Sequence, residues 1–122
     1  KYPEVKGILG TSSFDAPGTA RAIDELGLKG KVFTAGTGMP AANAQILKDG
    51  SVSALTLWDP ANAGYAMASL ATKILRGDTI EDGVNLGVEG YENMHFSPGS
   101  TKVLEGNGWL KITQDNVDSL GF

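Results

Sequence analysis

The chemistry that the sequence suggests first is nucleotide binding, at a glycine-rich turn. The residues Gly36-x-Gly38-x-x-Ala41 fit the dinucleotide pattern G-x-G-x-x-G/A. An acidic residue, Asp59, follows at about the expected spacing of roughly 20 residues. A pyrophosphate would use backbone N–H groups at the start of the next helix, where Pro40 has no N–H to offer. We therefore predict that Gly36 and Gly38 let the backbone turn tightly at the edge of a cleft, without a pyrophosphate.

Residue types that serve in catalysis are scarce. His95 is the only histidine and cysteine is absent, which excludes histidine triads, multi-histidine metal sites and thiol chemistry. We expect a structural or surface role for His95. Acidic pairs such as Asp24-Glu25 and Glu81-Asp82 lie on helix faces or beside turns, where solvated carboxylates are expected. Asp115 and Asp118 flank a predicted helical turn, and we expect them to be first-turn charges. The sequence predicts no enzyme activity, no cofactor and no metal.

Polar or aromatic residues follow three predicted strands at the point where each strand ends. These segments are 11–13 (Thr-Ser-Ser), the glycine turn 36–42, and Trp58-Asp59. Because ligands of open α/β sheets bind outside the carboxyl ends of the strands, we expect the three segments to share one ligand edge. An indole face beside a carboxylate suits a neutral polyol, and no lysine or arginine lies near these segments to hold a phosphate.

The elements that would position this edge alternate between strand and helix as far as Gly77. The predicted strands are 7–10, buried, then 31–35 and 53–58. The predicted helices are 16–26, 40–48 and 61–76, with inner stripes of Ala16, Ala20 and Ile23 in the first and of Ala63, Met67, Leu70, Ala71 and Ile74 in the third. Asp59-Pro60 is typical of an N-cap followed by proline at the first helical position. Helical crossovers between strands predict a parallel sheet.

The chain changes character after Gly77. Residues 78–112 hold short extended runs broken by glycine, which predict β-hairpins or irregular extended chain. Thr113 is predicted to cap one last helical turn, through Val117. The fold class predicted from these patterns is α/β, a parallel sheet flanked by helices, with an extended and irregular C-terminal tail.

Bulk composition is that of one globular domain. The 122 residues are 41% hydrophobic and 20% charged, with a net charge of −4 and no basic cluster, which argues against nucleic acid as a partner. No apolar stretch is long enough to span a membrane. The first residue is Lys1 rather than methionine, so we expect a processed chain or a piece of a longer one.

Several stretches together resemble a known family. They are the N-terminal segment 2–10 (YPEVKGILG), the turn 36–40 (GTGMP), the segment 57–60 (LWDP) with Gly64-Tyr65, and the ending 112–122. This combination resembles the sugar-type periplasmic substrate-binding proteins of ABC importers, and within them the rhamnose-binding and autoinducer-2-binding receptors. The resemblance covers essentially the whole chain.

The resemblance implies two α/β lobes that close on a ligand across a hinge, of which this chain looks like only the last part. Residues 1–58 would belong to the C-terminal ligand-binding lobe. Residues 59–122 would cross the hinge, form a helix and return between the lobes as an extended segment. The fold expected is thus a type I periplasmic-binding-protein lobe. We also expect uncovered apolar faces, and hence association with a missing N-terminal part or with itself.

The resemblance also implies site residues. In autoinducer-2 receptors the turn after this strand supplies a proline and, two residues later, a small residue whose backbone touches the ligand; Pro40 and Ala42 match these positions. Trp58 matches a position close to the hinge in ribose- and rhamnose-type proteins, with Asp59 next to it. The first loop of the ligand edge matches by position at two residues, Thr11 and Ser12.

The implied function is capture of a small polar ligand, a monosaccharide or the quorum-sensing signal autoinducer-2, and its delivery to an ABC transporter permease. The implied location is the periplasm, or the outside of a Gram-positive cell as a membrane-anchored lipoprotein. Two alternatives stay open, a fragment of a Rossmann-type NAD-dependent oxidoreductase and the sugar-sensing domain of a transcription repressor. The long segment from Asp78 onward resembles the transport receptors better.

Overall fold

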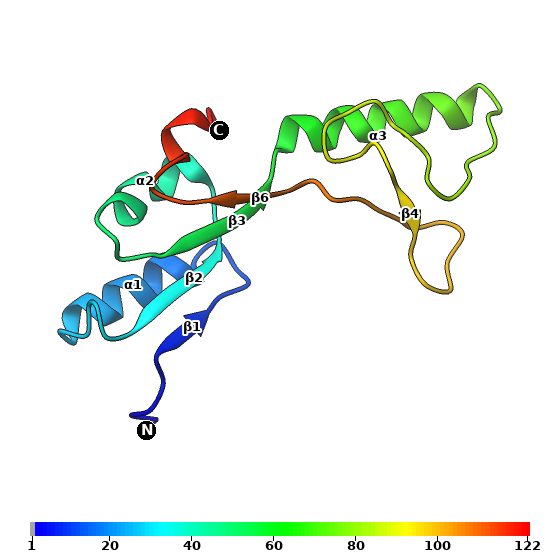
Figure 1. Cartoon of the computed structure of the whole chain (residues 1–122). Helices are drawn as coiled ribbons and strands as arrows, with labels where there is room; N and C mark the ends of the chain where they lie inside the picture. Colours follow the sequence, from blue (N-terminus) through cyan, green and yellow to red (C-terminus); the bar gives the residue numbers. More distant parts are fainter. Residues whose placement is uncertain (1) are drawn as a thin grey trace. The chain divides into compact units, whose positions relative to one another are not determined.

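The computed structural model describes residues 2–122 and divides them into two compact units. Among the described residues, the first unit consists of residues 2–57 and Leu110–Phe122, and the second of Trp58–Trp109. The chain therefore leaves the first unit after the third strand and returns to it with the last strand (Figure 1).

A four-stranded sheet organises the first unit. Its strands lie in the order β1 (Gly7–Leu9), β2 (Phe33–Thr37), β3 (Ala54–Trp58) and β6 (Trp109–Ile112). The first three strands are parallel, with Leu9 opposite Ala35 and Thr37 opposite Thr56. The parallel sheet predicted from the strand–helix alternation is confirmed, and the carboxyl ends of β1, β2 and β3 point the same way (Figure 1).

Two helices complete the first unit. Helix α1 (Asp15–Glu25) buries the predicted stripe of Ala16, Ala20 and Ile23. It ends before Gly27, whose φ of 66° lies in the left-handed region that favours glycine. Helix α2 (Pro40–Lys48) begins with its proline, as predicted. Both helices pack on one core whose central members are Leu47, Val52, Leu55, Leu57, Ile112 and Val117.

The prediction that the strand 7–10 is buried is wrong. β1 is an edge strand, and Leu9 is 84% exposed. Gly36 faces α1, because a methyl group there would lie 3.3 Å from Cβ of Ala16. Side chains alternate across a strand, so Ala35 and its partner Leu9 point to the other face of the sheet. Among the described residues no helix covers that face at Leu9, and the apolar side chain stays in contact with solvent.

The second unit is built on helix α3 (Pro60–Leu75). A short antiparallel hairpin of β4 (His95–Phe96) and β5 (Leu104–Glu105), preceded by the bridge between Val84 and Met94, packs against the helix. The hairpins predicted for residues 78–112 are therefore present in part, although Trp109–Ile112 joins the larger sheet. Among residues 2–122 no helix has the length and apolarity needed to cross a membrane.

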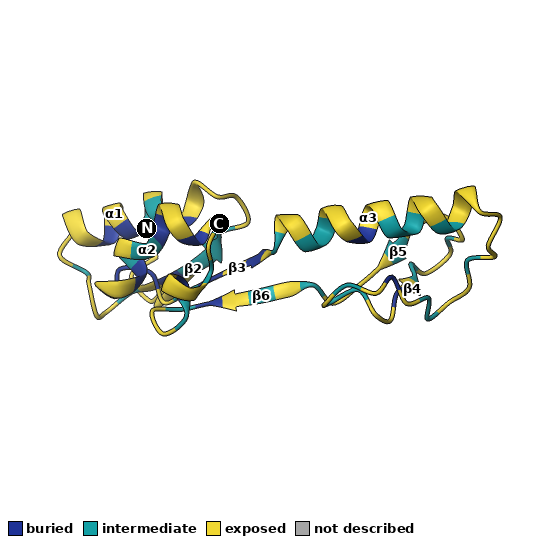
Figure 2. Ribbon diagram, turned by 90° about the horizontal axis from the view of Figure 1, so that it is seen from above, coloured by how far each residue is buried: buried dark blue, intermediate teal, exposed yellow. Residues whose placement is uncertain are grey.

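The inner stripe predicted for α3 is wrong in part. Ala66 is the buried residue of this helix, in contact with the cluster of Leu86 and Met94, whereas Met67 and Ile74 are 72% and 56% exposed. The hairpin covers only one side of the helix, and many other residues of the helix are exposed (Figure 2). Tyr65, Met67, Ile74 and Leu75 are the large hydrophobic residues among them. Periodicity identifies apolar positions but does not say which of them meet a partner.

The C-terminal segment closes the first unit. Ile112 and Val117 enter its core, and the N–H of Val117 donates to the carbonyl oxygen of Thr113 over 3.0 Å. This is the helical turn predicted from Thr113 to Val117, and it leads into the 3-10 helix η1 (Val117–Ser119). The backbone oxygen of Phe122 then accepts a hydrogen bond from the N–H of Ala41 at the start of α2.

Candidate functional site

The two glycines of the turn serve close packing rather than a left-handed backbone. A methyl group at Gly36 would lie 2.9 Å from the carbonyl oxygen of Gly10, and one at Gly38 would lie 2.9 Å from Nδ2 of Asn43. Neither glycine has a positive φ. We expected these glycines to allow a tight turn. In the structure they instead allow close approach, of Gly36 to the loop that holds Gly10 and of Gly38 to the start of α2.

The N-terminus of α2 is already used. Pro40 is its first residue and donates no hydrogen bond, while the N–H of Ala41 donates to the backbone oxygen of Phe122 over 3.2 Å. The side-chain amide of Asn43 donates to the carbonyl oxygen of Met39 over 2.9 Å. A pyrophosphate bound in the dinucleotide manner would need these N-terminal N–H groups, so the geometry disfavours a nucleotide site despite the G-x-G-x-x-A pattern.

The first loop of the predicted ligand edge is fixed by a carboxylate. The N–H groups of Thr11 and Ser12 both donate to Oδ2 of Asp15, over 3.0 and 2.9 Å. The N–H of Gly10 donates to the carbonyl oxygen of Ala35 over 3.0 Å, which fixes the loop to the neighbouring strand. The side chains of Thr11 and Ser12 are exposed. Backbone order and exposed hydroxyls are what a polar ligand edge needs.

The structure brings four of the predicted site residues to the ends of two paired strands. Thr11 and Ser12 follow β1, and Pro40 and Ala42 follow β2 across the start of α2. Pro40 is fully buried and Ala42 is exposed. The side chains of Thr11, Ser12 and Ala42 are thus accessible to solvent, and that of Pro40 is not.

Trp58 and Asp59 belong to the second unit. Oδ1 of Asp59 accepts hydrogen bonds from the N–H groups of Ala61 and Asn62, over 2.7 and 3.2 Å, and so caps α3 as predicted. Trp58 is 42% exposed. The strand alternates so that Leu55 and Leu57 enter the core and the indole of Trp58 points the other way. A half-exposed aromatic ring followed by a carboxylate, with Oδ2 outside the cap, is suited to stacking on a sugar and to accepting its hydroxyl hydrogens.

Sequence reasoning missed Trp109. Its ring meets that of Trp58 edge to face, with centroids 5.3 Å apart and an interplanar angle of 85°. The signal available was the alternation of the run 109–112, in which Ile112 is buried and Trp109 and Lys111 are exposed. That pattern places Trp109 on an open face of its strand, but it does not say which strand lies beside it.

The charged groups form structural pairs rather than a reactive cluster. Among residues 2–122 no group of three or more histidine and acidic side chains is placed to hold a metal ion. Nδ1 of His95 lies 2.9 Å from Oδ2 of Asp82, and the N–H of Phe96 donates to Oδ1 of the same carboxylate over 2.7 Å. The hydrogen bonds from His95 and Phe96 lower the pKa of Asp82 below its ordinary value. His95 thus ties the segment before the hairpin to β4, the structural role expected for it.

A second carboxylate stabilises the first unit. Hydrogen bonding with Ser51, whose backbone N–H donates to Oδ1 of Asp49 over 2.9 Å, and the nearby ammonium of Lys29 lower the pKa of Asp49. Nζ of Lys29 donates to Oγ of Ser51 over 2.9 Å, and this hydroxyl donates to Asp24 of α1 over 3.2 Å. The network joins the end of α1 to the loop before β3.

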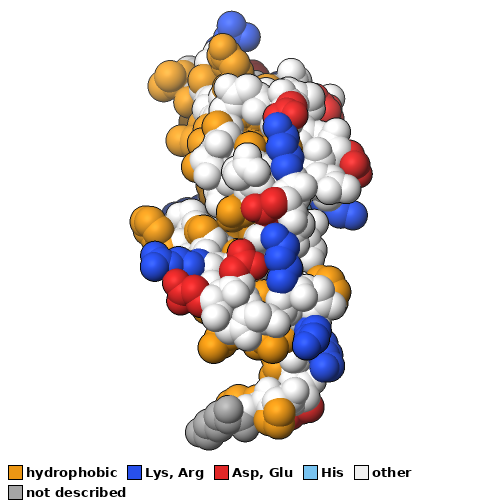
Figure 3. All heavy atoms as spheres, turned by 90° about the vertical axis from the view of Figure 1, so that its left-hand side faces the viewer, with side chains coloured by type: hydrophobic (Ala, Val, Ile, Leu, Met, Phe, Trp, Pro, Cys, Tyr) orange, Lys and Arg blue, Asp and Glu red, His pale blue; other side chains and the backbone are white. Residues whose placement is uncertain are grey.

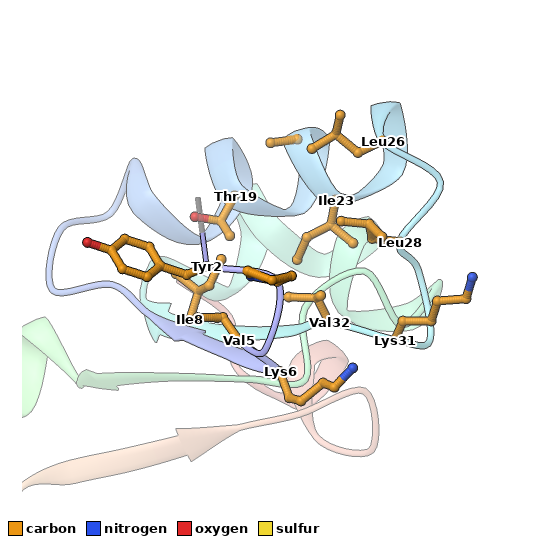
Figure 4. Close-up of a pocket in the computed structure, with 12 residues that line it drawn as sticks. Tyr2, Val5, Lys6, Ile8, Thr19, Ile23, Leu26, Leu28, Lys31 and Val32 are labelled. Atoms are coloured by element: carbon orange, nitrogen blue, oxygen red, sulfur yellow. The ribbon is translucent and has the colours of Figure 1, made fainter.

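An apolar groove of the first unit lies elsewhere. It is lined mainly by Val5, Ile8, Ile23, Leu28 and Val32, near the amino end of β1 and the second half of α1 (Figure 4). Hydrophobic side chains are also exposed beside the N-terminal segment (Figure 3). Thr11 and Ser12 follow the opposite, carboxyl end of β1. The groove offers few polar partners and is unsuited to a polyol, but it is an uncovered apolar surface of the kind expected from the sequence.

Comparison with known proteins gives one family. Residues 1–79 match the model of the periplasmic binding protein domain. A sugar ABC transporter protein from Actinomyces odontolyticus is similar in structure with a TM-score of 0.77 and 29% identity, over 99% of this chain and 38% of that one.

Two further solved structures share the fold. LsrB from Clostridium saccharobutylicum in complex with AI-2 has a TM-score of 0.69 and 21% identity, over 99% of this chain and 41% of that one. GanP, a glucose-galactose binding protein from Geobacillus stearothermophilus, has a TM-score of 0.69 and 18% identity, over 94% of this chain and 34% of that one. The chain thus spans well under half the length of each of these proteins.

Proposed function

Because this chain belongs to the periplasmic binding protein domain family, we propose that it is the C-terminal portion of the solute-binding component of an ABC importer. The component captures a small polar ligand between two lobes and delivers it to a membrane permease. Closure of the lobes is a population shift, since the ligand contacts both lobes only in the closed state. The protein acts by binding and not by catalysis.

The observation that carries this proposal is the half-exposed indole of Trp58 directly before the helix-capping carboxylate of Asp59. The ring supplies a flat apolar surface for the C–H face of a sugar, and Oδ2 of Asp59 accepts hydrogen bonds from its hydroxyls. Four residues of the first unit are also among the proposed ligand-binding residues, the exposed Thr11, Ser12 and Ala42 and the buried Pro40.

We propose a neutral polyhydroxylated ligand, either a monosaccharide or autoinducer-2, and in the latter case a role in quorum sensing. Support for this ligand class comes from the chemistry of the edge. Thr11, Ser12 and Trp58 offer hydroxyls and an aromatic face, and among the described residues no ion pair involves the six proposed site residues. A phosphorylated ligand would need cationic partners there.

The proposal includes the organisation and location of the whole protein. Residues 1–58 belong to the C-terminal ligand-binding lobe, and residues 59–122 cross the hinge, form α3 and return. An N-terminal part, or a second copy of the chain, covers the apolar face that carries Leu9. The protein works in the periplasm, or on the outside of a Gram-positive cell as an anchored lipoprotein. The exposure of Leu9 and of large hydrophobic residues of α3 supports the need for a covering partner.

Calorimetric titration of the full-length protein that carries this chain tests the function. D-ribose, L-rhamnose and autoinducer-2 are titrated into the parent and into the Trp58→Ala and Tyr65→Ala variants. Tyr65 is an exposed aromatic residue of α3 outside the proposed site and serves as the control. We expect one ligand to bind the parent and the Tyr65→Ala variant alike, and the Trp58→Ala variant about tenfold more weakly, in line with the loss of an aromatic contact. Equal affinity in all three proteins would remove Trp58 from the site.

A further inference from the structure

The two tryptophans form a contact that neither hydrophobic core explains. Trp58 and Trp109 are 42% and 57% exposed, and neither belongs to the core cluster of the first unit or to that of the second. A tryptophan that only filled a core would be buried on both faces of its ring. Here the edge of one indole meets the face of the other, and a large part of each ring stays open.

The geometry of the pair restrains the ring directions. An interplanar angle of 85° and a centroid distance of 5.3 Å match the edge-to-face arrangement that the aromatic quadrupole favours. Both side chains project from strand ends and lie on the exposed sides of their strands, while the neighbouring Leu57 and Leu110 turn inward. An exposed tryptophan without such a partner would sample several rotamers, and the pairing restricts this freedom.

The position of the pair in the chain is also distinctive. Trp58 is the first residue of the second unit and Trp109 is the last, so the contact joins the two points at which the chain enters and leaves that unit. Asp59, which caps α3, follows Trp58 directly. The helix cap thereby holds the backbone that follows Trp58, and the contact with Trp109 holds the indole ring.

We infer that Trp109 is a positioning residue, which holds the indole of Trp58 in the orientation that stacks on a flat, neutral, hydroxyl-bearing ligand. This inference rests on the proposed function. The contact with Trp109 restricts the side chain of Trp58 before the ligand binds. Less side-chain entropy is therefore lost on binding, and the affinity for the ligand is higher. The expected contribution is about three- to tenfold in Kd, the range of an aromatic pair.

The pair itself is tested without any ligand. The chain has only two tryptophans, so an exciton couplet in the far-ultraviolet circular dichroism spectrum of the 122-residue chain must arise from Trp58 and Trp109. We expect the couplet in the parent and in the Tyr65→Leu control, and its loss in Trp109→Leu, which keeps an apolar residue in the strand. A parent spectrum without a couplet overturns the inference.

Ligand titration of the full-length protein then tests the role. The probes are D-ribose, L-rhamnose and autoinducer-2. For the probe that binds, Trp109→Leu should raise the Kd by about three- to tenfold. Trp109→Phe retains an aromatic edge and should restore most of the affinity. A lost couplet with unchanged Kd in Trp109→Leu shows that Trp109 does not position Trp58 for binding. If the parent shows the couplet but binds none of the probes, the proposed function is wrong, and the inference that rests on it is overturned as well. The couplet then shows that the tryptophan pair is present and that the ligand-binding role is the part that failed.

Discussion

Gly36 gives the sharpest test of how the strand ends are built. Substitution by alanine places a methyl group 2.9 Å from the carbonyl oxygen of Gly10 and 3.3 Å from Cβ of Ala16. Contacts this short force the backbone of the neighbouring loop to shift, which costs about 1–3 kcal/mol in a well-packed site. Alanine also reduces the entropy of the unfolded chain, a gain of about 0.4–1 kcal/mol. The difference predicts a net loss of about 0.5–2 kcal/mol for Gly36→Ala.

The matched control is Gly18→Ala in α1. A methyl group at Gly18 meets no atom within 4 Å, and the residue lies in a helix, where alanine is more favourable than glycine by about 0.5–1 kcal/mol. The two substitutions are chemically identical and should shift the stability of the same unit in opposite directions. Urea unfolding followed by far-ultraviolet circular dichroism measures both midpoints.

The outcome distinguishes packing from nucleotide binding as the reason for this glycine. If Gly36 existed to admit a pyrophosphate, alanine would impair NAD binding and leave folding intact. A Gly36→Ala variant as stable as the parent, or more stable, would refute the close-approach argument. A lower midpoint for Gly36→Ala together with a higher one for Gly18→Ala would support it.

Three further predictions concern stability and association. Replacing Asp59 by alanine should lower the stability of the second unit by about 1 kcal/mol, whereas asparagine, which also caps helices, should preserve it. Equal melting temperatures for the two variants would disprove the capping role. Because the pKa of Asp82 is lowered in the folded state, its ionised carboxylate contributes to the stability of the fold, fully so above the ordinary carboxyl pKa of about 3.9. This contribution is lost as the pH falls through the lowered pKa, so Asp82→Asn should flatten the acid limb of a stability–pH curve. An unchanged acid limb would count against the contact with His95. Leu9→Glu should reduce self-association of the isolated chain in sedimentation velocity, and undiminished association would place the contact elsewhere.

Local signals in the sequence predicted much of the fold. The stripe of Ala16, Ala20 and Ile23 and the Asp59-Pro60 start of α3 both depend on residues close in the chain, and the structure confirms both. The parallel sheet followed from helices placed between strands. Strand ends were less accurate, and β2 lies about two residues later than predicted.

The errors concern contacts between distant segments. Leu9 and Met67 are apolar and regularly spaced, but their exposure depends on whether another segment covers them, which spacing cannot reveal. The contact of Trp109 with Trp58 depends on the order β3–β6, and the use of the α2 N-terminus by Phe122 depends on the return of the chain. The roles of Thr11, Ser12, Pro40, Ala42, Trp58 and Asp59 in ligand binding, and the division of the chain at residue 58 into lobes, stay predictions.

A tryptophan-fluorescence titration of the full-length protein with D-ribose, L-rhamnose, autoinducer-2 and NAD distinguishes a polyol receptor from a nucleotide-binding protein. The exposed rings of Trp58 and Trp109 make the signal sensitive to a ligand at the proposed edge. We expect a saturable response to one neutral polyol and no response to NAD. A saturable response to NAD alone, or no response to any polyol, would contradict the assignment of this chain to a polyol-binding receptor.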